Sequence, residues 1–456
     1  MRRKSKAPLG IMGFFAVAIG GVLFVNSSSM FERTPPTIDL ETNGYWNLKK
    51  PLLLKMNDTS GIVSYRVSLK TSGGISSLNS EKFITPEKKV SLEIQPPRSA
   101  YVLKDKVISI IVEATDGSKW NFFHGNSVKR EYKLIIDRKR PQVSIVANSY
   151  KISRGGSAVV IFKAEDNNMK NLYIHTSFGK DFKVVPFYKE GYYISLLAWP
   201  VPESDFRATV IAKDKAGNSA RTYIPLYLKE KYYRTSKITL TDKFLKGKIA
   251  QLAEDFIQTQ GVTNPLKRFK IINEDVRAEN EKLIHTVTSK VPDEMVSDFR
   301  INRMYPLRNA KVVAYFGDHR KYYYDGSFIS EAYHVGLDMA SYSMAKIKPQ
   351  NSGTVVFADY NGLYGNMPII YHGLGLYTLY GHCSSIAVNV GDHIRPNQLI
   401  AHTGKTGYAM GDHLHFGVLV QGIEVRPQEW MDRKWIKTNI TNIIKKAKKI
   451  IKRSES

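Results

Sequence analysis

Two short stretches decide the interpretation of the C-terminal part of this chain: HVGLD at residues 334–338 and HLHFG at residues 413–417. In an extended segment, side chains two or four residues apart point to the same face. The imidazole and carboxylate of the first stretch, His334 and Asp338, can therefore converge on one cation. His413 and His415 of the second stretch can reach one pocket, although their spacing leaves open which of them would be a ligand.

Histidines are concentrated around these stretches. The chain has 11 histidines, and eight of them lie between His319 and His415. The surrounding residues are rich in Gly, Tyr, Val and Ile, which predicts strands joined by turns. Zinc accepts mixed nitrogen and oxygen ligands, and a catalytic zinc keeps an open position for water. A lone His-x-His pair is more often incidental, so the prediction depends on both stretches occurring together.

Further motifs accompany the two stretches in order along about 100 residues: YGN at 364–366, YHG at 371–373, YGH at 380–382, VGD at 390–392, TGKTG at 403–407 and VRP at 425–427. Together they resemble the lysostaphin-type (LytM) zinc metallopeptidases, which hydrolyse peptide bonds in the bacterial cell wall. The resemblance implies an all-β catalytic domain at residues 301–432. It does not extend to the rest of the chain.

Carried over position by position, the resemblance implies that His334, Asp338 and His415 bind Zn2+ and that His382 and His413 are unligated catalytic histidines. A zinc ion would lower the pKa of a bound water and polarise the scissile carbonyl. The chain has no His-Glu-x-x-His helix, so a histidine, with an ordinary pKa of ~6.5, is the candidate base. Which of the two histidines takes the proton stays open.

Three further residues are predicted substrate contacts: Asn366, Tyr333 and Tyr380. A turn-forming role is equally plausible for Asn366, and tyrosines on strands usually serve packing. His372 is expected to be structural or to line the cleft. Cys383, the only cysteine, follows a predicted catalytic histidine on a strand, so its thiol should face away from the metal and pack in the core.

The N-terminal residues predict a membrane anchor. Four basic residues within the first six precede an uncharged apolar stretch at residues 7–25. As a helix, this stretch would reach ~28 Å, against a bilayer core of ~30 Å. Positive charge before the span predicts that the N-terminus is inside and the catalytic domain lies on the periplasmic or outer side of the cytoplasmic membrane. A cleaved signal peptide is the alternative, but its apolar region is usually shorter.

An internal repeat with an offset close to 100 residues follows this segment. Residues 111–117, for example, resemble residues 210–217. Both copies alternate apolar and polar residues in short runs broken by Gly, Asn and Asp, which predicts two immunoglobulin-like β-sandwiches. Such modules serve as spacers or binding surfaces, so protein partners are expected there.

Two segments have helical periodicity. Apolar spacing from Phe244 to Phe256 and an Asn264-Pro265 helix start predict a helical linker, placed to cover the cleft. The tail carries isoleucines on one helical face and lysines on the rest, so it would lie on an anionic membrane or cap its own domain. The predicted order in this mainly β chain is anchor and tether 1–36, sandwiches 37–138 and 139–232, helical linker 233–300, peptidase domain 301–432 and basic tail 433–456.

The composition predicts a folded protein with a polyanionic partner. The net charge is +26, from 67 Lys and Arg against 41 Asp and Glu. No zinc-finger, P-loop or RNA-binding motif occurs, so nucleic acid is not an expected partner. Peptidoglycan is the predicted substrate, with endopeptidase and carboxypeptidase action both open and a role in wall remodelling or cell shape. The alternative is a non-enzymatic activator or scaffold for other wall hydrolases, which the five retained site residues disfavour.

Overall fold

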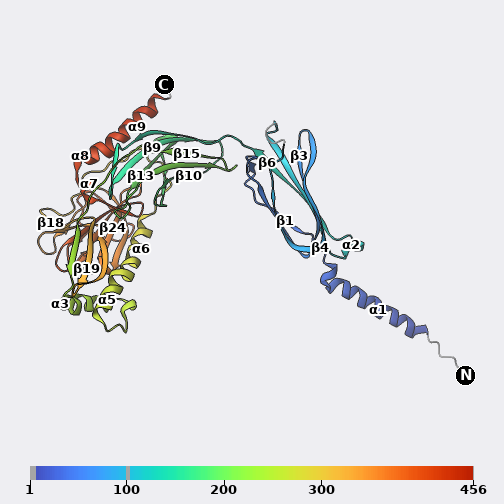
Figure 1. Cartoon of the computed structure of the whole chain (residues 1–456), viewed down its shortest axis with the longest axis horizontal. Helices are drawn as coiled ribbons and strands as arrows, with labels where there is room; N and C mark the ends of the chain where they lie inside the picture. The colour runs from blue at the N-terminus through green and yellow to red at the C-terminus, as the bar shows by residue number, and fades with distance from the viewer. Residues whose placement is uncertain (1–6, 99–102, 455–456) are drawn as a thin grey trace. The chain divides into compact units, whose positions relative to one another are not determined.

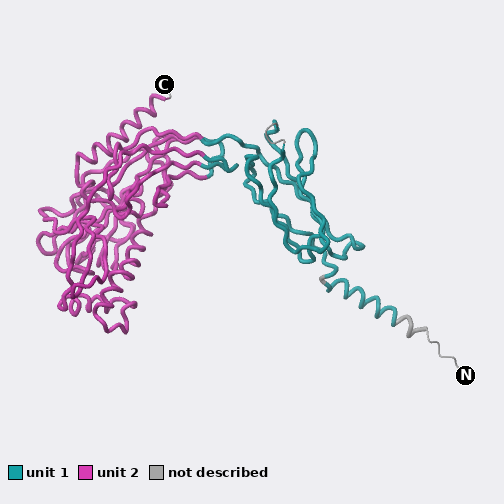
Figure 2. Tube along the Cα trace, in the orientation of Figure 1, with its two compact units in different colours: residues 1–141, 166–170, 213–219 teal, residues 142–165, 171–212, 220–456 magenta. Residues whose placement is uncertain are grey.

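The computed structural model describes residues 7–98 and 103–454 (Figure 1). The chain divides into two compact units (Figure 2). Unit 1 contains residues up to Pro141 together with 166–170 and 213–219, and unit 2 contains the other residues from Gln142 onward. The second predicted sandwich therefore belongs largely to the same unit as the predicted peptidase domain. The sequence pattern had predicted two separate domains.

The apolar N-terminal stretch forms helix α1 (Ala7–Ser27), followed by the 3-10 turn η1 (Ser29–Phe31). The predicted basic residues before it lie outside the described residues. Within the described part of the chain, no helix meets the length and apolarity needed to cross a membrane. The predicted membrane span is therefore not supported.

Unit 1 contains one hydrogen-bonded sheet of six strands in the order β1-β3-β5-β6-β2, with β4 paired to β3. Strands β3 and β4 are long, and bulges interrupt their pairing, for example between Asn57 and Ile62. The side chains of Trp46, Leu54, Met56 and Val67 form part of its core. Two separate sheets were expected here, so the immunoglobulin-like assignment of this segment is not confirmed. The strands are β1 (Thr37–Leu40), β2 (Tyr45–Trp46), β3 (Leu52–Thr71), β4 (Gly74–Ile94), β5 (Val107–Asp116) and β6 (Ser127–Ile136), and a short helix α2 (Trp120–Phe123) precedes β6.

The second repeat forms two four-stranded sheets, in the orders β11-β10-β14-β15 and β12-β13-β9-β7, and the pair β16-β8. Two sheets agree with the predicted sandwich, while the immunoglobulin-like assignment stays a prediction. Hydrogen bonds connect this region to the peptidase domain within unit 2: the Gln421 side chain pairs with both backbone groups of Lys183, and Trp430 Nε1 donates to Ser157 Oγ at 3.2 Å. The strands are β7 (Gln142–Asn148), β8 (Lys151–Ser153), β9 (Ser157–Glu165), β10 (Met169–Thr176), β11 (Asp181–Lys183), β12 (Val185–Phe187), β13 (Lys189–Ala198), β14 (Ala208–Asp214), β15 (Ser219–Tyr223) and β16 (Tyr227–Lys229).

The predicted helical segment is confirmed as helical and is part of the peptidase core. Asn264 caps α5 by accepting from the backbone of Leu266 and Lys267, and Pro265 occupies the first helical position. Ile249 and Phe269 share one core with Tyr364 and other residues of the following sheet. Deletion of the segment would therefore expose that core. Its elements are β17 (Thr235–Thr239), α3 (Asp242–Phe244), η2 (Leu245–Ile249), α4 (Ala250–Ala253), η3 (Ile257–Thr259), α5 (Pro265–Ile271), η4 (Ile272–Val276) and α6 (Arg277–Thr288).

The predicted peptidase domain is built on a sheet in the order β18-β21-β29-β25-β24-β23-β27, with β30 paired to β29. Strand β29 is central and entirely buried. Two three-stranded sheets, β17-β19-β20 and β22-β28-β26, are formed by strands that, apart from β17, lie between those of the large sheet along the chain. The elements are β18 (Lys311–Ala314), β19 (Asp318–Tyr324), β20 (Ser327–His334), β21 (Leu337–Ala340), β22 (Lys346–Ile347), β23 (Gly353–Asn361), η5 (Gly362–Tyr364), β24 (Gly365–Tyr371), β25 (Leu376–Gly381), β26 (Ser385–Ile386), β27 (His393–Ile394), β28 (Ala401–His402), β29 (Leu414–Val420) and β30 (Ile423–Val425).

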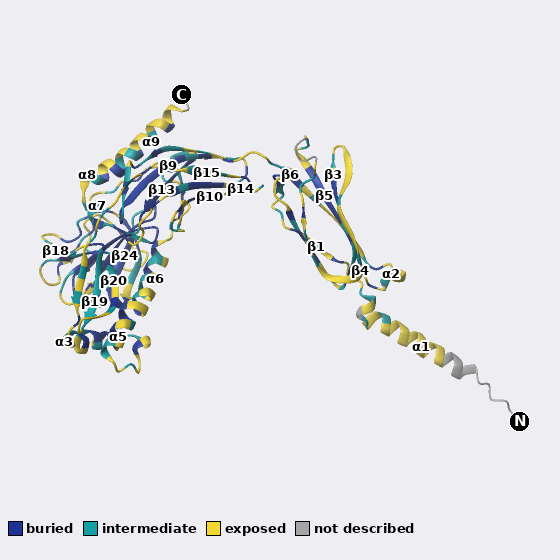
Figure 3. Cartoon of the chain, in the orientation of Figure 1, coloured by how far each residue is buried: buried dark blue, intermediate teal, exposed yellow. Residues whose placement is uncertain are grey.

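The tail forms α7 (Pro427–Met431), α8 (Arg433–Ile436), the π-helix η6 (Lys437–Thr441) and α9 (Asn442–Arg453). The α9 helix packs on β7 and β9 and buries Ile444, Ala447 and Ile451, while most of its lysines are exposed (Figure 3). The tail was expected to lie on a membrane or to cap its own domain, and in the structure α9 packs on β7 and β9 of the preceding predicted sandwich.

Candidate metal centre and cleft

The three predicted metal ligands meet at the end of the central sheet. His334 is the last residue of β20, Asp338 lies on β21, and His415 lies near the start of β29. Asp338 and His415 are directly paired in the antiparallel register of β21 and β29. His334 and Asp338 were expected on one extended segment, but the strand ends at His334 and the chain resumes pairing at Leu337. A turn, rather than strand alternation, therefore brings these two side chains together.

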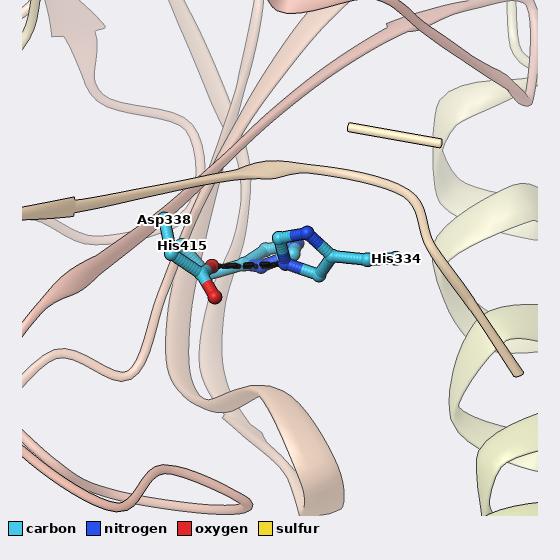
Figure 4. A group of neighbouring side chains, drawn as sticks. All are labelled: His334, Asp338 and His415. Atoms are coloured by element: carbon cyan, nitrogen blue, oxygen red, sulfur yellow. Dashed lines mark hydrogen bonds and ion pairs between the residues drawn. The ribbon is translucent and has the colours of Figure 1, made fainter. Parts of the chain in front are cut away.

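The ligand atoms of this triad converge on one point (Figure 4). Asp338 Oδ1 lies 3.0 Å from His334 Nε2 and 2.9 Å from His415 Nδ1, and the two nitrogens are 3.2 Å apart. Three ligands of a tetrahedral zinc at about 2.0–2.2 Å would be about 3.3–3.6 Å apart. The observed spacings are close to that value.

Hydrogen bonds around the triad indicate that a cation fits it. His334 Nδ1 lies 2.9 Å from the Tyr315 carbonyl, which requires the proton on Nδ1 and leaves Nε2 as an acceptor. That acceptor faces a carboxylate oxygen and the ring nitrogen of His415. Burial alone would raise the pKa of Asp338, but when the facing ring nitrogens of His334 and His415 are protonated, their charge and hydrogen bonds hold the pKa well below its ordinary value. Three electron-rich atoms at this distance suit a metal ion, and imidazole and carboxylate suit zinc.

Two glycines make room for the ring of His415. A Cβ on Gly336 would lie 2.3 Å from His415 Nε2, and one on Gly381 would lie 3.3 Å from His415 Cβ. The glycine in the first motif is therefore required by its close packing against the ring of His415.

The two predicted catalytic histidines stand beside the triad. The ring centroids of His382 and His413 are 4.8 Å apart, and His413 Nε2 is 3.8 Å from Asp338 Oδ1. Each Nδ1 lies 2.8 Å from a backbone carbonyl, of Thr406 for His382 and of Gly411 for His413. Both Nδ1 atoms must therefore carry the proton, so each Nε2 is free to accept one.

His382 is held in a restrained position. It follows β25 with a left-handed backbone φ of 65°, and its backbone N–H donates to the Tyr364 carbonyl at 2.7 Å. Burial, followed by the neighbouring His413 and His415, lowers its pKa to about 3. In the metal-free site, the imidazole of His382 is therefore neutral at physiological pH.

The five residues line one cleft of about 640 Å³. One wall comes from the helical segment, through Ile238, Leu240, Phe244 and Arg277. Phe244 stacks on Tyr408 of the loop that leads to His413, with ring centroids 6.0 Å apart. The predicted cleft-covering segment thus forms a side of the cleft.

The structure separates the three predicted substrate contacts. Tyr333 lines the cleft, whereas Asn366 and Tyr380 do not. The Asn366 side chain donates to the Cys383 carbonyl at 3.1 Å and so secures the backbone after His382. Tyr380 is 2% exposed and accepts a hydrogen bond from Thr378. Both side chains make hydrogen bonds inside the fold, and the substrate contacts of Asn366 and Tyr380 stay predictions.

Sequence reasoning missed several residues of the cleft. Arg277, Arg320, Tyr322 and Tyr408 line it, but no motif marks them. The only available signal was strand alternation, since Arg320 and Tyr322 lie on the same face of β19.

His372 and Cys383, for which a structural role was predicted, both lie inside the fold. His372 Nε2 contacts Thr378 Oγ1 at 2.7 Å and Nδ1 contacts the Ser352 carbonyl at 2.7 Å, while burial lowers its pKa to about 4. Cys383 is fully buried, and burial raises its thiol pKa to about 12. Neither residue lines the cleft.

Comparisons with known proteins match the same region. Residues 332–427 match the model of Peptidase family M23. DD-carboxypeptidase/endopeptidase Mpg of Neisseria meningitidis serogroup B is 33% identical over 94 residues, 21% of this chain and 22% of that protein. Murein hydrolase activator EnvC of Escherichia coli is 34% identical over 98 residues, 22% of this chain and 23% of that protein.

A solved structure, the catalytic domain of the antimicrobial peptidase lysostaphin from Staphylococcus simulans, is 27% identical. The matched region covers 27% of this chain and 92% of the lysostaphin domain, with a TM-score of 0.23. The chain spans about a fifth of the length of Mpg and EnvC.

Proposed function

Because residues 332–427 form a peptidase family M23 domain, we propose that this chain is a zinc-dependent peptidase that hydrolyses peptide bonds of bacterial peptidoglycan. The observation that carries the proposal is the convergence of three acceptor atoms, from His334, Asp338 and His415, beside two further imidazoles in one cleft. Similarity to a protein named DD-carboxypeptidase/endopeptidase supports the substrate class.

His334 Nε2, Asp338 Oδ1 and His415 Nδ1 would hold the zinc. When bound, zinc supplies a water of lowered pKa and polarises the scissile carbonyl. The hydrogen bond from His334 to Tyr315 fixes the tautomer in which Nε2 faces the site. The contact between Gly336 and His415 fixes the position of the second imidazole.

His413 is the proposed general base. Its Nδ1 proton is held by Gly411, so its Nε2 accepts a proton from water at the site, and it lies 3.8 Å from the ligand oxygen of Asp338. His382, held by Thr406, is the proposed partner that binds the carbonyl oxygen as negative charge forms. This role requires a proton on Nε2 of His382, and its source is the proton that His413 takes from water, since the two ring centroids lie 4.8 Å apart.

The proposal is tested with purified protein loaded with zinc and incubated with peptidoglycan sacculi, beside the His413→Ala variant. Separation of the released muropeptides by liquid chromatography and mass spectrometry identifies the bond cut. Loss of cross-linked or pentapeptide species with the wild type alone is the expected result. No change with wild-type protein that is folded and holds one zinc would refute hydrolysis of peptidoglycan.

A second function is an activator of other wall hydrolases. The observation in its favour is the 34% identity to a protein named murein hydrolase activator. The retention of the complete triad and of both additional histidines favours the enzyme. An activator would stimulate a separate hydrolase equally well as wild type and as His413→Ala.

We also propose that the protein acts on the outer side of the cytoplasmic membrane, because peptidoglycan lies there. Protease treatment of spheroplasts, which leave the cytoplasm sealed, tests this location. The peptidase domain should be digested without lysis, and protection until lysis would contradict the proposed location.

A further inference from the structure

Two arginines line the cleft in addition to the metal triad. Arg320 lies on β19 opposite Ala332 of β20, in the register that also places Asp318 opposite His334. The strand therefore presents Arg320 on the same side as the first metal ligand. Arg277 reaches the cleft from the start of α6.

The guanidinium of Arg320 has no short partner. Its Nε lies 3.6 Å from Asp318 Oδ2, and its Nη2 lies 3.9 Å from Asp338 Oδ2. Among the described residues, no carboxylate approaches its guanidinium within ordinary hydrogen-bond distance. The side chain is 26% exposed, so its donors are accessible to a ligand in the cleft.

Hydrogen bonds to Asn273 fix one edge of the Arg277 guanidinium. Its Nε donates to the Asn273 carbonyl at 3.2 Å and its Nη2 to Asn273 Oδ1 at 3.0 Å. The remaining Nη1 lies 3.9 Å from Glu281. Burial raises the pKa of Glu281, which weakens it as a counter-charge.

The two guanidiniums act on the same part of the cleft. Arg277, Arg320 and Tyr408 line the same cleft, and in agreement with this both guanidiniums oppose the rise that burial causes in the pKa of Tyr408.

The carboxylates of the cleft lining do not balance this charge. Only Asp338 and Asp412 belong to the described lining. Asp338 is a metal ligand in the proposed function. Asp412 already accepts from Thr403 Oγ1 at 2.5 Å, from Ser343 Oγ at 3.2 Å and from the backbone of Met344 at 3.0 Å. The lining of a zinc-loaded cleft would therefore carry excess positive charge, with Asp318 and Glu281 outside the lining as the nearest further carboxylates.

The geometry points to a carboxylate-binding subsite made by Arg320 with Arg277, so that the enzyme selects peptides with a free carboxylate within about one residue of the scissile bond. Arginine presents paired N–H donors that match a carboxylate, and such charge-assisted bonds are stronger than neutral ones. The inference rests on the proposed peptidase function and deepens it. The carboxylate can belong to the peptide C-terminus or to the side chain of a diamino acid, and the test separates the two.

The test uses four synthetic probes: a stem pentapeptide ending in D-alanyl-D-alanine, its C-terminal amide, a cross-linked stem dimer with a free diamino-acid carboxylate, and the same dimer amidated there. The kcat and KM are measured for zinc-loaded wild type, Arg320→Ala and Arg320→Lys. Arg395→Ala, an exposed arginine of the same domain outside the cleft, is the matched control.

Wild type should prefer one carboxylate probe over its amide by about 10- to 100-fold in kcat/KM. Arg320→Ala should lose that preference by slowing the carboxylate probe alone, mainly through KM, while Arg320→Lys keeps part of it and Arg395→Ala keeps all of it. Preference for the pentapeptide acid assigns the C-terminus, and preference for the free dimer assigns the side chain.

Equal cleavage of acid and amide by wild type would overturn the subsite. A second result would also overturn it: Arg320→Ala loses zinc and cleaves a carboxylate probe and its amide more slowly by the same factor. Arg320 would then act only by positioning Asp338. If no probe is cut, binding of the four probes to zinc-loaded protein by calorimetry separates the two proposals. A carboxylate preference abolished by Arg320→Ala would retain the subsite while the peptidase function fails, and its absence would refute the subsite.

Discussion

Two groups of side chains in the described residues bring three potential ligand atoms together, and they differ in what those atoms face. The triad of His334, Asp338 and His415 has its acceptors turned toward one another. The second group, defined here as the acidic trio, consists of Asp137, Asp166 and Asp214 of unit 1. Its oxygens accept hydrogen bonds from neighbouring amides of Lys139, Asn168 and Asn218.

The difference shows that proximity of acidic groups is a weak sign of a zinc site. In the trio, each carboxylate already accepts at least one hydrogen bond from a nearby side-chain or backbone amide, as in Asx turns. The trio also lacks the imidazole and thiolate ligands that zinc favours over oxygen alone. The electrostatics are opposite as well: imidazoles lower the pKa of Asp338, whereas burial and the other two carboxylates raise the pKa of Asp166.

The largest expected effect follows from removing a ligand. His415→Ala should lose stoichiometric zinc and reduce peptidoglycan cleavage by more than the about 10- to 100-fold that follows loss of an outer-shell partner. The control is Asp214→Asn in the acidic trio, which should leave zinc content and peptidoglycan cleavage unchanged. Zinc content by mass spectrometry and muropeptide release are the measurements, and zinc loss in Asp214→Asn would break the comparison.

Removal of an unligated histidine should separate zinc binding from chemistry. His413→Ala should retain one zinc per chain and lower kcat by about 10²- to 10⁴-fold, since it removes the proposed general base. Metal content and kcat are measured on the same sample. Loss of zinc together with activity would make His413 a ligand and would enlarge the triad.

The close packing around His415 can be tested without changing a ligand. In Gly336→Ala, the new Cβ would lie 2.3 Å from His415 Nε2, so the ring must move. Zinc affinity should fall by about 10- to 100-fold, as for other losses of ligand orientation. Gly247→Ala is the control, because its Cβ would meet nothing within 4 Å. Competition with a zinc chelator gives both affinities, and equal values would contradict the packing argument.

The smallest effect concerns the acidic trio. The folded pKa of Asp166 is raised above its unfolded value, so its stabilising contribution is present below about pH 3.9 and is lost as pH rises through the folded pKa. Asp166→Asn should therefore raise the thermal unfolding temperature slightly at pH 7, with the difference disappearing near pH 3.5. A destabilised variant at pH 7 would indicate that the ionised carboxylate is bound to a cation.

The triad and its two neighbouring histidines were predicted from the resemblance to a known family, because spacing alone left open which of His413 and His415 is a ligand. Residue spacing could not show that His334 and Asp338 lie on two strands, since the turn at Gly336 interrupts the alternation. Arg320 and Arg277 were not predicted because they reach the cleft from β19 and α6, which carry no motif. The packing of α9 on β7 and β9 was left open, since an amphipathic face fits a membrane and a sheet equally well.

The repeat was predicted as two similar modules, and the structure gives them different surroundings. The second shares unit 2 with the peptidase domain through Gln421 and Trp430, whereas the first is grouped separately. Strand alternation reports only on neighbouring residues. It therefore could not predict that Gln421 and Trp430 contact the second sandwich.

The most direct test of the central claim is a zinc titration of metal-free protein in which bound zinc and release of muropeptides are recorded together. The account predicts that release is absent without metal, rises in proportion to bound zinc and stops rising at one equivalent, in wild type and Asp214→Asn alike. Full release from metal-free protein in chelator, or one tightly bound zinc with no release from any peptidoglycan, would contradict it.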